Sequence, residues 1–212
     1  ISLFIGLVFS LGSSSAISNI IAGYTMTYRR LFREGDRVKI GATVGAVTQV
    51  RLQVTHIRTP KNEEVVIPNS TILNTEVTNY STMAKSEGLI LHTTVGIGYE
   101  TPWRQVEAML LLAAERTPGL APGRQHFVLQ RALGDFAVTY ELNAYIDDPS
   151  RILFLYSELH RQILDVFNEF NIQIMTPAYE GDPAQPKVVP KEQWWSAPAA
   201  PDPTPPERTD RA

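Results

Sequence analysis

The pattern of apolar and polar positions changes twice along the chain, and each pattern predicts a different kind of structure. Residues 1–28 carry no charge, and their small residues recur at four-residue spacing, as they do on one face of a long helix. Residues 36–80 alternate apolar and polar positions in short runs, which predicts strands. These runs are Arg37–Ile40, Ala46–Val50, Thr55–Thr59 and Glu64–Ile67. Short strands so closely spaced predict a small, strongly curved all-β sheet or barrel.

Residues 81–176 combine both periods and predict a third region. We expect a helix that begins at Thr101-Pro102, with Thr101 as its N-cap, and ends near Arg116. A second helix begins after Asp148-Pro149. Strands are expected at 88–96, 126–133, 136–146 and 172–175. The resulting order, β-α-β-β-α-β, is that of a ferredoxin-like α/β domain.

The predicted organisation is therefore a helix over 1–34, a β domain over 35–80, a ferredoxin-like α/β domain over 81–178 and a tail over 179–212. Nine of the fifteen prolines lie from Pro177 onward, so we expect the tail to be largely disordered. A short ordered segment is expected around the valine pair at 188–189 and the tryptophan pair at 194–195.

The uncharged N-terminal stretch exceeds the roughly 20 residues that cross a bilayer, so we predict a transmembrane helix. Its many Gly, Ser and Ala residues favour a helix that packs against neighbours or borders water. Arg29, Arg30 and Arg33 follow at once and predict a cytoplasmic end, because basic residues are enriched on that side. Residues after about 30 are then cytoplasmic. The sequence begins with Ile rather than Met, and we expect further membrane helices upstream.

Composition narrows the possible chemistry. The 212 residues include no cysteine, which excludes disulfides, thiolate metal sites and cysteine nucleophiles. A net charge of -3 gives no general argument for nucleic-acid binding. The four histidines are isolated in sequence, so we expect no catalysis, no metal and no cofactor.

Six motifs in order resemble the MscS-type (small-conductance) mechanosensitive channel family. Residues 18–23 (SNIIAG) and 30–36 (RLFREGD) are similar to the family's pore-helix segment and to its R-P-F-x-x-G-D motif, with Leu31 in place of the proline. The other motifs are 45–47 (GAV), 58–59 (RT), 66–69 (VIPN) and 79–81 (NYS). The resemblance covers about residues 1–176.

The resemblance implies a homo-heptamer in the cell (inner) membrane, multi-pass in the full-length protein, with one pore-lining helix per subunit. Leu7 and Leu11 align with the family's two constricting leucine rings. Ser15 aligns with a glycine at which the family's pore helix kinks, so the hinge is expected to move to Gly12 or to be stiffer. Gly6 belongs to the small-residue packing face.

The remaining motif residues have roles with open alternatives. Asn19 either ties the pore helix to the β domain or faces a wet pore. Gly23 permits close packing or acts as a hinge. The arginines at 29, 30 and 33 bind anionic lipid headgroups or serve as a plain positive-inside anchor. Gly35-Asp36 opens the β domain, and Pro68-Asn69 forms a structural turn that ends a strand and sets subunit contacts.

The function implied is a mechanosensitive ion channel, opened by membrane tension, that releases ions and small solutes on hypo-osmotic shock. Its expected partners are membrane lipids, further copies of the chain and permeating solutes, with no nucleic acid. One alternative is a channel of the same fold modulated by a ligand or by voltage. A second is a soluble RNA-binding β-barrel module, which residues 36–80 disfavour because Tyr80 is their only aromatic residue.

Overall fold

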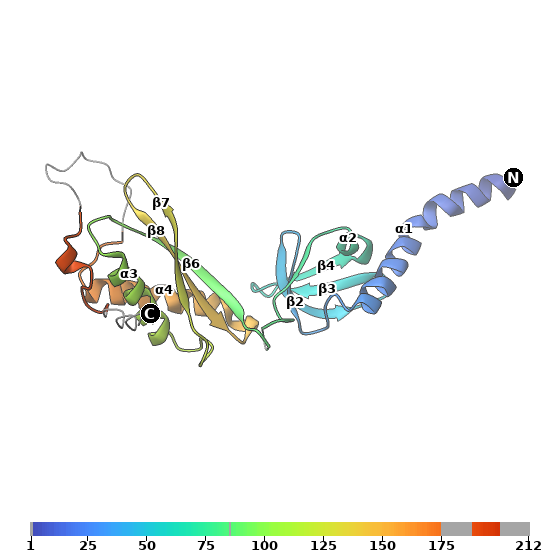
Figure 1. Ribbon diagram of the computed structural model, residues 1–212. Helices are drawn as coiled ribbons and strands as arrows, with labels where there is room; N and C mark the ends of the chain where they lie inside the picture. Colours follow the sequence, from blue (N-terminus) through green and yellow to red (C-terminus); the bar gives the residue numbers. More distant parts are fainter. Residues whose placement is uncertain (1, 85, 175–187, 200–212) are drawn as a thin grey trace, which may run out of the picture. The chain divides into compact units, whose positions relative to one another are not determined.

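The computed structural model describes residues 2–84, 86–174 and 188–199, and it describes residues 2–13 as helical backbone without their side chains. The chain forms two compact units. The first comprises Ile1–Leu89 with Asp147–Arg151, and the second comprises Ile90–Ile146 with Ile152–Ala212. Figure 1 shows the elements of each unit, which are described separately below.

The first unit begins with the long helix α1 (Ser2–Arg29), which runs unbroken through Gly12 and Ser15. The predicted helix is therefore present. No helix in the described part of the chain is both long enough and apolar enough to cross a bilayer. The predicted membrane span includes residues whose side chains lie outside the described part of the chain, so it stays a prediction.

One face of α1 packs on the β domain (Figure 1). Ala22, Gly23 and Met26 are buried and lie one turn apart at spacings of three and four, so they share one side of the helix. Met26 joins a core made by the sheet and the next helix. The other members of this core are Phe32, Val38, Ile40, Val47, Ile57 and Ile72.

The β domain is a five-stranded antiparallel sheet in the order β4-β3-β2-β1-β5. Its strands are β1 (Arg37–Ile40), β2 (Thr43–Val50), β3 (Val54–Arg58), β4 (Glu64–Pro68) and β5 (Val77–Asn79). The predicted strands are confirmed, and β2 is longer than predicted because Gly45 lies within it. A side chain at Gly45 would place its Cβ 2.5 Å from the Arg58 carbonyl oxygen, so the close pairing of β2 with β3 needs glycine there.

The sequence did not predict two elements of the first unit, the helix α2 (Asn69–Leu73) and strand β5. Pro68 precedes α2 in an extended conformation, as the residue at a helix N-cap commonly is. Asn69 and Ile72 are buried within α2, so this short helix is held by tertiary contacts rather than by its own length.

The second unit contains β6 (Leu89–Ile97), α3 (Trp103–Arg116), β7 (Phe127–Leu133), β8 (Val138–Ile146) and α4 (Ile152–Glu169). The 3₁₀ turn η1 (Pro149–Arg151) precedes α4. Its sheet has the order β6-β8-β7, and α3 and α4 share one core with the buried residues of β8. These positions agree with the predicted elements to within about two residues.

Two details of the second unit differ from the prediction. The last strand is reduced to one antiparallel bridge between Ile97 and Ile174, while Met175 lies outside the described residues. Thr101 does not cap α3: Pro102 occupies the N-cap position and no side chain caps this end. Proline at that position fixes the backbone entry to the helix, so the helix begins one residue later than predicted.

Residues 188–199, which we call the C-terminal strap, lie against the start of α3. The strap contains the 3₁₀ turn η2 (Lys191–Gln193). The Gln105 side chain donates to the Ala197 carbonyl at 2.7 Å, and the Trp194 indole donates to the Val189 carbonyl at 3.3 Å. The strap includes the short ordered segment predicted here, whereas residues 179–187 and 200–212 of the predicted tail lie outside the described residues.

Candidate functional site: the junction of α1 with the β domain

Asn69 is the centre of the polar contacts at the junction. It is fully buried, and its Oδ1 accepts a hydrogen bond from the Thr55 hydroxyl at 2.9 Å. Its Nδ2 donates to the carbonyls of Arg51 and Leu52 at 2.9 and 3.0 Å, and its backbone N–H donates to Gln53 at 2.9 Å. One amide therefore fixes the whole β2–β3 turn relative to the start of α2.

Gly23 brings the backbone of α1 directly onto this turn. A Cβ at position 23 would lie 2.5 Å from the Leu52 carbonyl oxygen and 2.6 Å from Asn69 Nδ2. Both distances are far below van der Waals contact, so only glycine permits this approach. Of the two roles considered for Gly23, the close-packing role agrees with this geometry.

Asn19 contacts the β domain one turn earlier in α1. Its Nδ2 donates to the Ser15 carbonyl at 2.9 Å, and its Oδ1 accepts the backbone N–H of Ser70 at 2.9 Å. Ser70 lies in the first turn of α2, where backbone N–H groups have no partner inside the helix. The Asn19 side chain thus joins α1 to the start of α2 by a hydrogen bond, and its role in a channel stays a prediction.

The chain leaves α1 through a turn that is fixed by Gly35 and Asp36. Gly35 has a positive φ of 90°, and its N–H donates to the Val47 carbonyl at 2.8 Å. Asp36 Oδ2 accepts from the Arg33 N–H and from Asn79 Nδ2, each at 2.9 Å. This carboxylate therefore connects the end of α1 with β5, an element that follows more than forty residues later.

Arg29, Arg30 and Arg33 are exposed around this exit. Arg30 and Arg33 border a shallow pocket of about 330 Å³, which also includes the apolar side chains of Met26 and Phe32. Positive charge beside an apolar surface is compatible with either predicted role, lipid contact or positive-inside anchoring.

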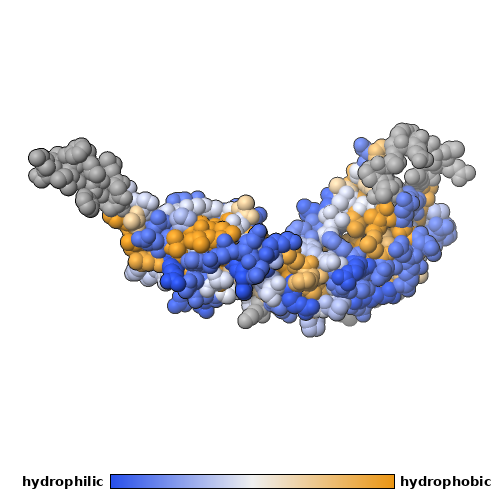
Figure 2. Space-filling model, turned by 180° about the vertical axis from the view of Figure 1, so that it is seen from behind, coloured by the Kyte–Doolittle hydropathy of each residue, from blue (hydrophilic) through white to orange (hydrophobic). Residues whose placement is uncertain are grey.

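The opposite face of α1 exposes a stripe of large apolar and aromatic side chains. Its members, which we call the α1 stripe, are Ile17, Ile21, Tyr24 and Tyr28, between 52% and 80% exposed. Tyr24 and Tyr28 stack with ring centroids 6.5 Å apart. Apolar surface on the described part of α1 is visible beside the apolar area of the β domain in Figure 2. Sequence reasoning missed this stripe, although its spacing of four, three and four residues marks one helix face.

The predicted gate and packing residues in the first half of α1 are only partly described. Gly6, Leu7, Leu11 and Gly12 lie in the helix, but their side chains are outside the described part. Ser15 is exposed, and its carbonyl accepts the Asn19 bond. Asn19, Gly23 and Asn69 lie together where α1 meets the β2–β3 turn and α2, and the sequence could not show that Thr55 belongs with them. Gly35 and Asp36 instead contact Arg33, Val47 and Asn79.

Nothing in the described residues forms a cluster of three or more His, Asp or Glu side chains that could hold a metal ion. His56 pairs with Glu64 across β3 and β4 at 3.0 Å, and His160 Nε2 lies 2.9 Å from the Thr93 hydroxyl. These contacts are pairs on the domain surfaces.

The chain matches two family descriptions with this organisation. Residues 15–82 match "Mechanosensitive ion channel, beta-domain", and residues 91–174 match "Mechanosensitive ion channel MscS, C-terminal". The chain is 26% identical over 180 residues to the small-conductance mechanosensitive channel MscMJ of Methanocaldococcus jannaschii, covering 82% of this chain and 50% of that protein. It is 28% identical over 145 residues to the mechanosensitive channel MscK of Escherichia coli, covering 68% and 13%.

Solved structures have the same fold. A crystal structure of Helicobacter pylori MscS in a closed state aligns with a TM-score of 0.68 at 19% identity, covering 86% of this chain and 71% of that one. The cryo-EM structure of wild-type MSL1 from Arabidopsis thaliana aligns with a TM-score of 0.61 at 16% identity, covering 81% and 60%.

These observations define a chain that carries the β-domain and C-terminal domain of mechanosensitive ion channels. The chain belongs to the MscS-type mechanosensitive channel family. It spans half or less of the length of the curated relatives just described. The family assignment replaces the alternative of an RNA-binding β-barrel module.

Proposed function

We propose that this chain is part of an ion channel that membrane tension opens, and that releases ions and small solutes on hypo-osmotic shock. Family membership supports the class of function. The observation that carries the proposal is the junction, where Asn19, Gly23 and Met26 hold α1 against the β domain. If a helix held in this way is displaced, the β domain attached to it moves as well.

In this proposal α1 crosses the cell (inner) membrane as one of seven pore-lining helices, and residues after about 30 are cytoplasmic. A pore-lining helix contacts water on one side and neighbouring helices on the others, so it needs less apolar character than an isolated span. The α1 stripe supports the assembly, because four large side chains on one face are left exposed in the single chain. A second copy of the chain would cover them.

The gate is assigned to Leu7 and Leu11. Residues four apart lie one above the other on a helix, so seven copies would form two adjacent apolar rings. Water leaves a narrow apolar neck because it cannot replace its lost hydrogen bonds there, and ions are then blocked. Tension shifts the population toward the open state if that state occupies more area in the membrane.

Patch-clamp recording of the natural full-length protein in liposomes under suction tests the proposal. We expect stretch-activated currents, and we expect Leu11→Ser to open at lower tension or to leak when closed. Phe9→Ser, on the opposite face of the helix from Leu7 and Leu11, is the matched control and should behave as the parent protein. Absence of any stretch-activated current would contradict the proposed function, and currents gated only by voltage would favour the alternative channel type.

A further inference from the structure

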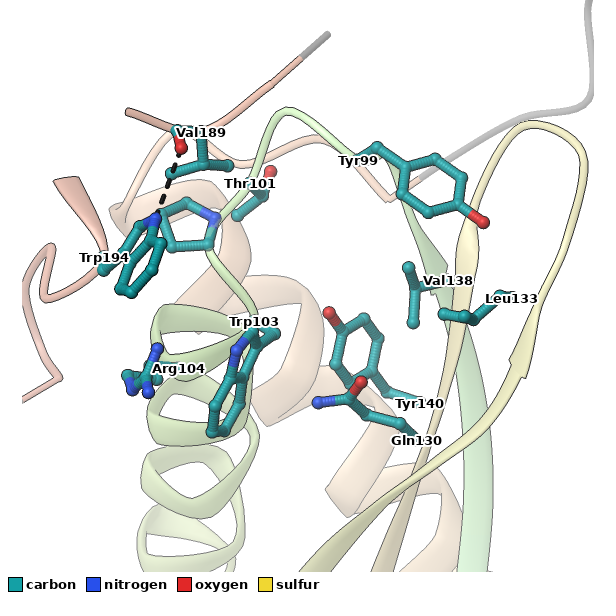
Figure 3. A pocket seen from close by; sticks show the side chains of 11 residues that line it. Tyr99, Thr101, Trp103, Arg104, Gln130, Leu133, Val138, Tyr140, Val189 and Trp194 are labelled. Carbon is teal, nitrogen blue, oxygen red and sulfur yellow. Dashed lines mark hydrogen bonds between the residues drawn. The ribbon is translucent and has the colours of Figure 1, made fainter. Parts of the chain in front are cut away.

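The second unit contains a pocket that the channel function does not use. Its volume is about 470 Å³, and it lies at the start of α3 between the β7–β8 hairpin and the strap (Figure 3). Four aromatic side chains line it: Tyr99, Trp103, Tyr140 and Trp194. Both its size and its mostly apolar walls are typical of sites for small organic ligands.

Among the described residues that line the pocket, Arg104 is the one with a charge. Its guanidinium carbon lies 4.3, 4.5 and 5.6 Å from the ring centroids of Trp103, Trp195 and Trp194, which are all the tryptophans of the chain. Its Nε is buried and donates no hydrogen bond within the described structure. The described lining therefore carries one positive charge, and Arg104 Nε is an unused donor beside the aromatic rings.

Two neutral side chains add hydrogen-bonding capacity on the sheet side. Figure 3 shows Tyr140 and Gln130 projecting from the hairpin toward Trp103. Burial, with smaller contributions from Glu107 and Tyr99, raises the pKa of Tyr140 to about 12, so its hydroxyl remains a donor at neutral pH. Glu107 itself lies outside the lining, one turn along α3 next to Arg104.

The strap forms one wall of this pocket. Val189 and Trp194 both line it, and the hydrogen bond between them holds the Trp194 ring at the rim (Figure 3). The strap is in turn attached to α3 by the bond from Gln105 to Ala197. The site is therefore complete only when the strap is in place.

We propose that this pocket binds a small organic anion with a flat apolar body, such as an aromatic carboxylate. The four aromatic side chains pack against the flat body of the ligand, and Arg104 binds its carboxylate. An organic cation is disfavoured because Arg104 already occupies the rings that would hold it, and a small inorganic anion would leave the apolar walls uncovered. This inference depends on the second unit alone and stands or falls separately from the channel function.

Intrinsic tryptophan fluorescence of the purified 212-residue chain tests this directly, because all three tryptophans surround Arg104. The probe is 3-phenylpropionate, compared with 3-phenylpropanol and 3-phenylpropylammonium, which share its body but are neutral and cationic. We expect a saturable fluorescence change with the anion, about tenfold weaker binding of the alcohol, and no saturable change with the cation. Isothermal titration calorimetry provides an independent measurement.

Substitutions of lining residues test whether 3-phenylpropionate binds in this pocket. Arg104→Gln should weaken 3-phenylpropionate about tenfold and leave the alcohol unchanged, since only a charge-assisted contact is lost. Tyr140→Phe, which keeps the aromatic volume, should weaken the anion severalfold, and a chain that ends at residue 187 should lose binding. Arg161→Gln, an exposed arginine of α4 outside the lining, is the matched control that retains binding.

Equal binding of all three probes would overturn the assignment of an anion. No saturable change with 3-phenylpropionate in the parent chain, with a normal unfolding transition, would overturn the site. Neither result affects the stretch-activated currents expected of the full-length protein.

Discussion

At the scale of single residues, the junction of α1 with the β domain depends on Asn69 and Gly23, and no other residue type fits either position. The Asn69 side chain donates two hydrogen bonds to the β2–β3 turn and accepts one from Thr55 in β3, and Gly23 leaves room for that turn. Substitution of either residue by alanine should therefore lower the stability of the first unit.

Asn69→Ala should lower the free energy of unfolding of the first unit by about 2–4 kcal/mol. The change leaves the Thr55 hydroxyl and two carbonyls unsatisfied in a buried place, and each such group costs about 1–3 kcal/mol unless water reaches it. Urea unfolding followed by circular dichroism measures the loss. Asn74→Ala, an exposed amide in the same segment that bonds the Ser70 carbonyl at 2.8 Å, is the matched control and should cost less than 1 kcal/mol. A loss no larger than the control's would show that Asn69 is not the centre of the junction.

Gly23→Ala should destabilise the first unit, by about 1–3 kcal/mol, because the new methyl overlaps the Leu52 carbonyl. The same substitution in an unpacked helix would stabilise it by up to about 1 kcal/mol, so the sign alone distinguishes packing from a free hinge. Gly96→Ala is the control, since its Cβ would lie 3.6 Å from the Ala137 Cβ, an ordinary contact. A stabilised Gly23→Ala variant would contradict the close approach.

His126 should make the second unit less stable in acid. Burial lowers the pKa of His126, and its Nδ1 accepts the Tyr145 N–H at 3.2 Å, so the folded state favours the neutral ring. Its contribution is complete above the unfolded pKa of about 6.5 and is lost as the pH falls through the lower folded pKa. Thermal midpoints between about pH 7.5 and 5 should fall more for the parent chain than for His126→Gln. Parallel pH profiles would contradict this assignment.

At the scale of elements, α1 has two faces with different tasks. One face is buried on the β domain, and the α1 stripe is exposed on the other. Because large apolar and aromatic surfaces of this kind mark contact sites, the stripe is the surface that we expect another copy to cover.

Tyr24→Ser combined with Ile21→Ser should therefore weaken self-association without unfolding the β domain, since both side chains are more than half exposed. Native mass spectrometry in detergent should show a shift from oligomer to smaller species. Leu52→Ser is the control, as its side chain is 63% exposed but lies outside the stripe. Unchanged assembly in the double variant would show that the stripe is not a subunit contact.

The elements differ in whether a local sequence pattern was enough to predict them. Strands β1 to β4 and both helices of the second unit follow from their apolar period, because each has a face to bury. Helix α2 has no such period, since Asn69, Ser70 and Thr71 are polar and only Ile72 enters the core. The partners of Asn69 lie 14 to 18 residues away along the chain, so its role depends on a fold that no local pattern specifies.

At the scale of the whole molecule, each unit has its own hydrophobic core. One core is made by residues 26–72 and the other by residues 97–167, and all three tryptophans belong to the second unit. Tryptophan fluorescence therefore reports on the second unit, whereas circular dichroism reports on both.

Ile57→Ala should lower the stability seen by circular dichroism by about 2–5 kcal/mol and leave the fluorescence transition in place. Leu142→Ala, buried in the other core, is the reciprocal variant and should shift the fluorescence transition by a similar amount. Movement of both transitions by Ile57→Ala would mean that the two units unfold as one.

The contacts at Asn19, Ala22, Gly23 and Met26 also determine where α1 is free to bend. Below Asn19 the helix is fastened to the β domain, and from Ser14 to Ser18 its described side chains are exposed. The helix therefore bends about the turn at Asn19, where its packing on the β domain begins. The position of this bend is determined by that packing rather than by a flexible residue. A serine at position 15 is compatible with such bending, because the Asn19–Ser70 hydrogen bond one turn later resists the displacement of the helix.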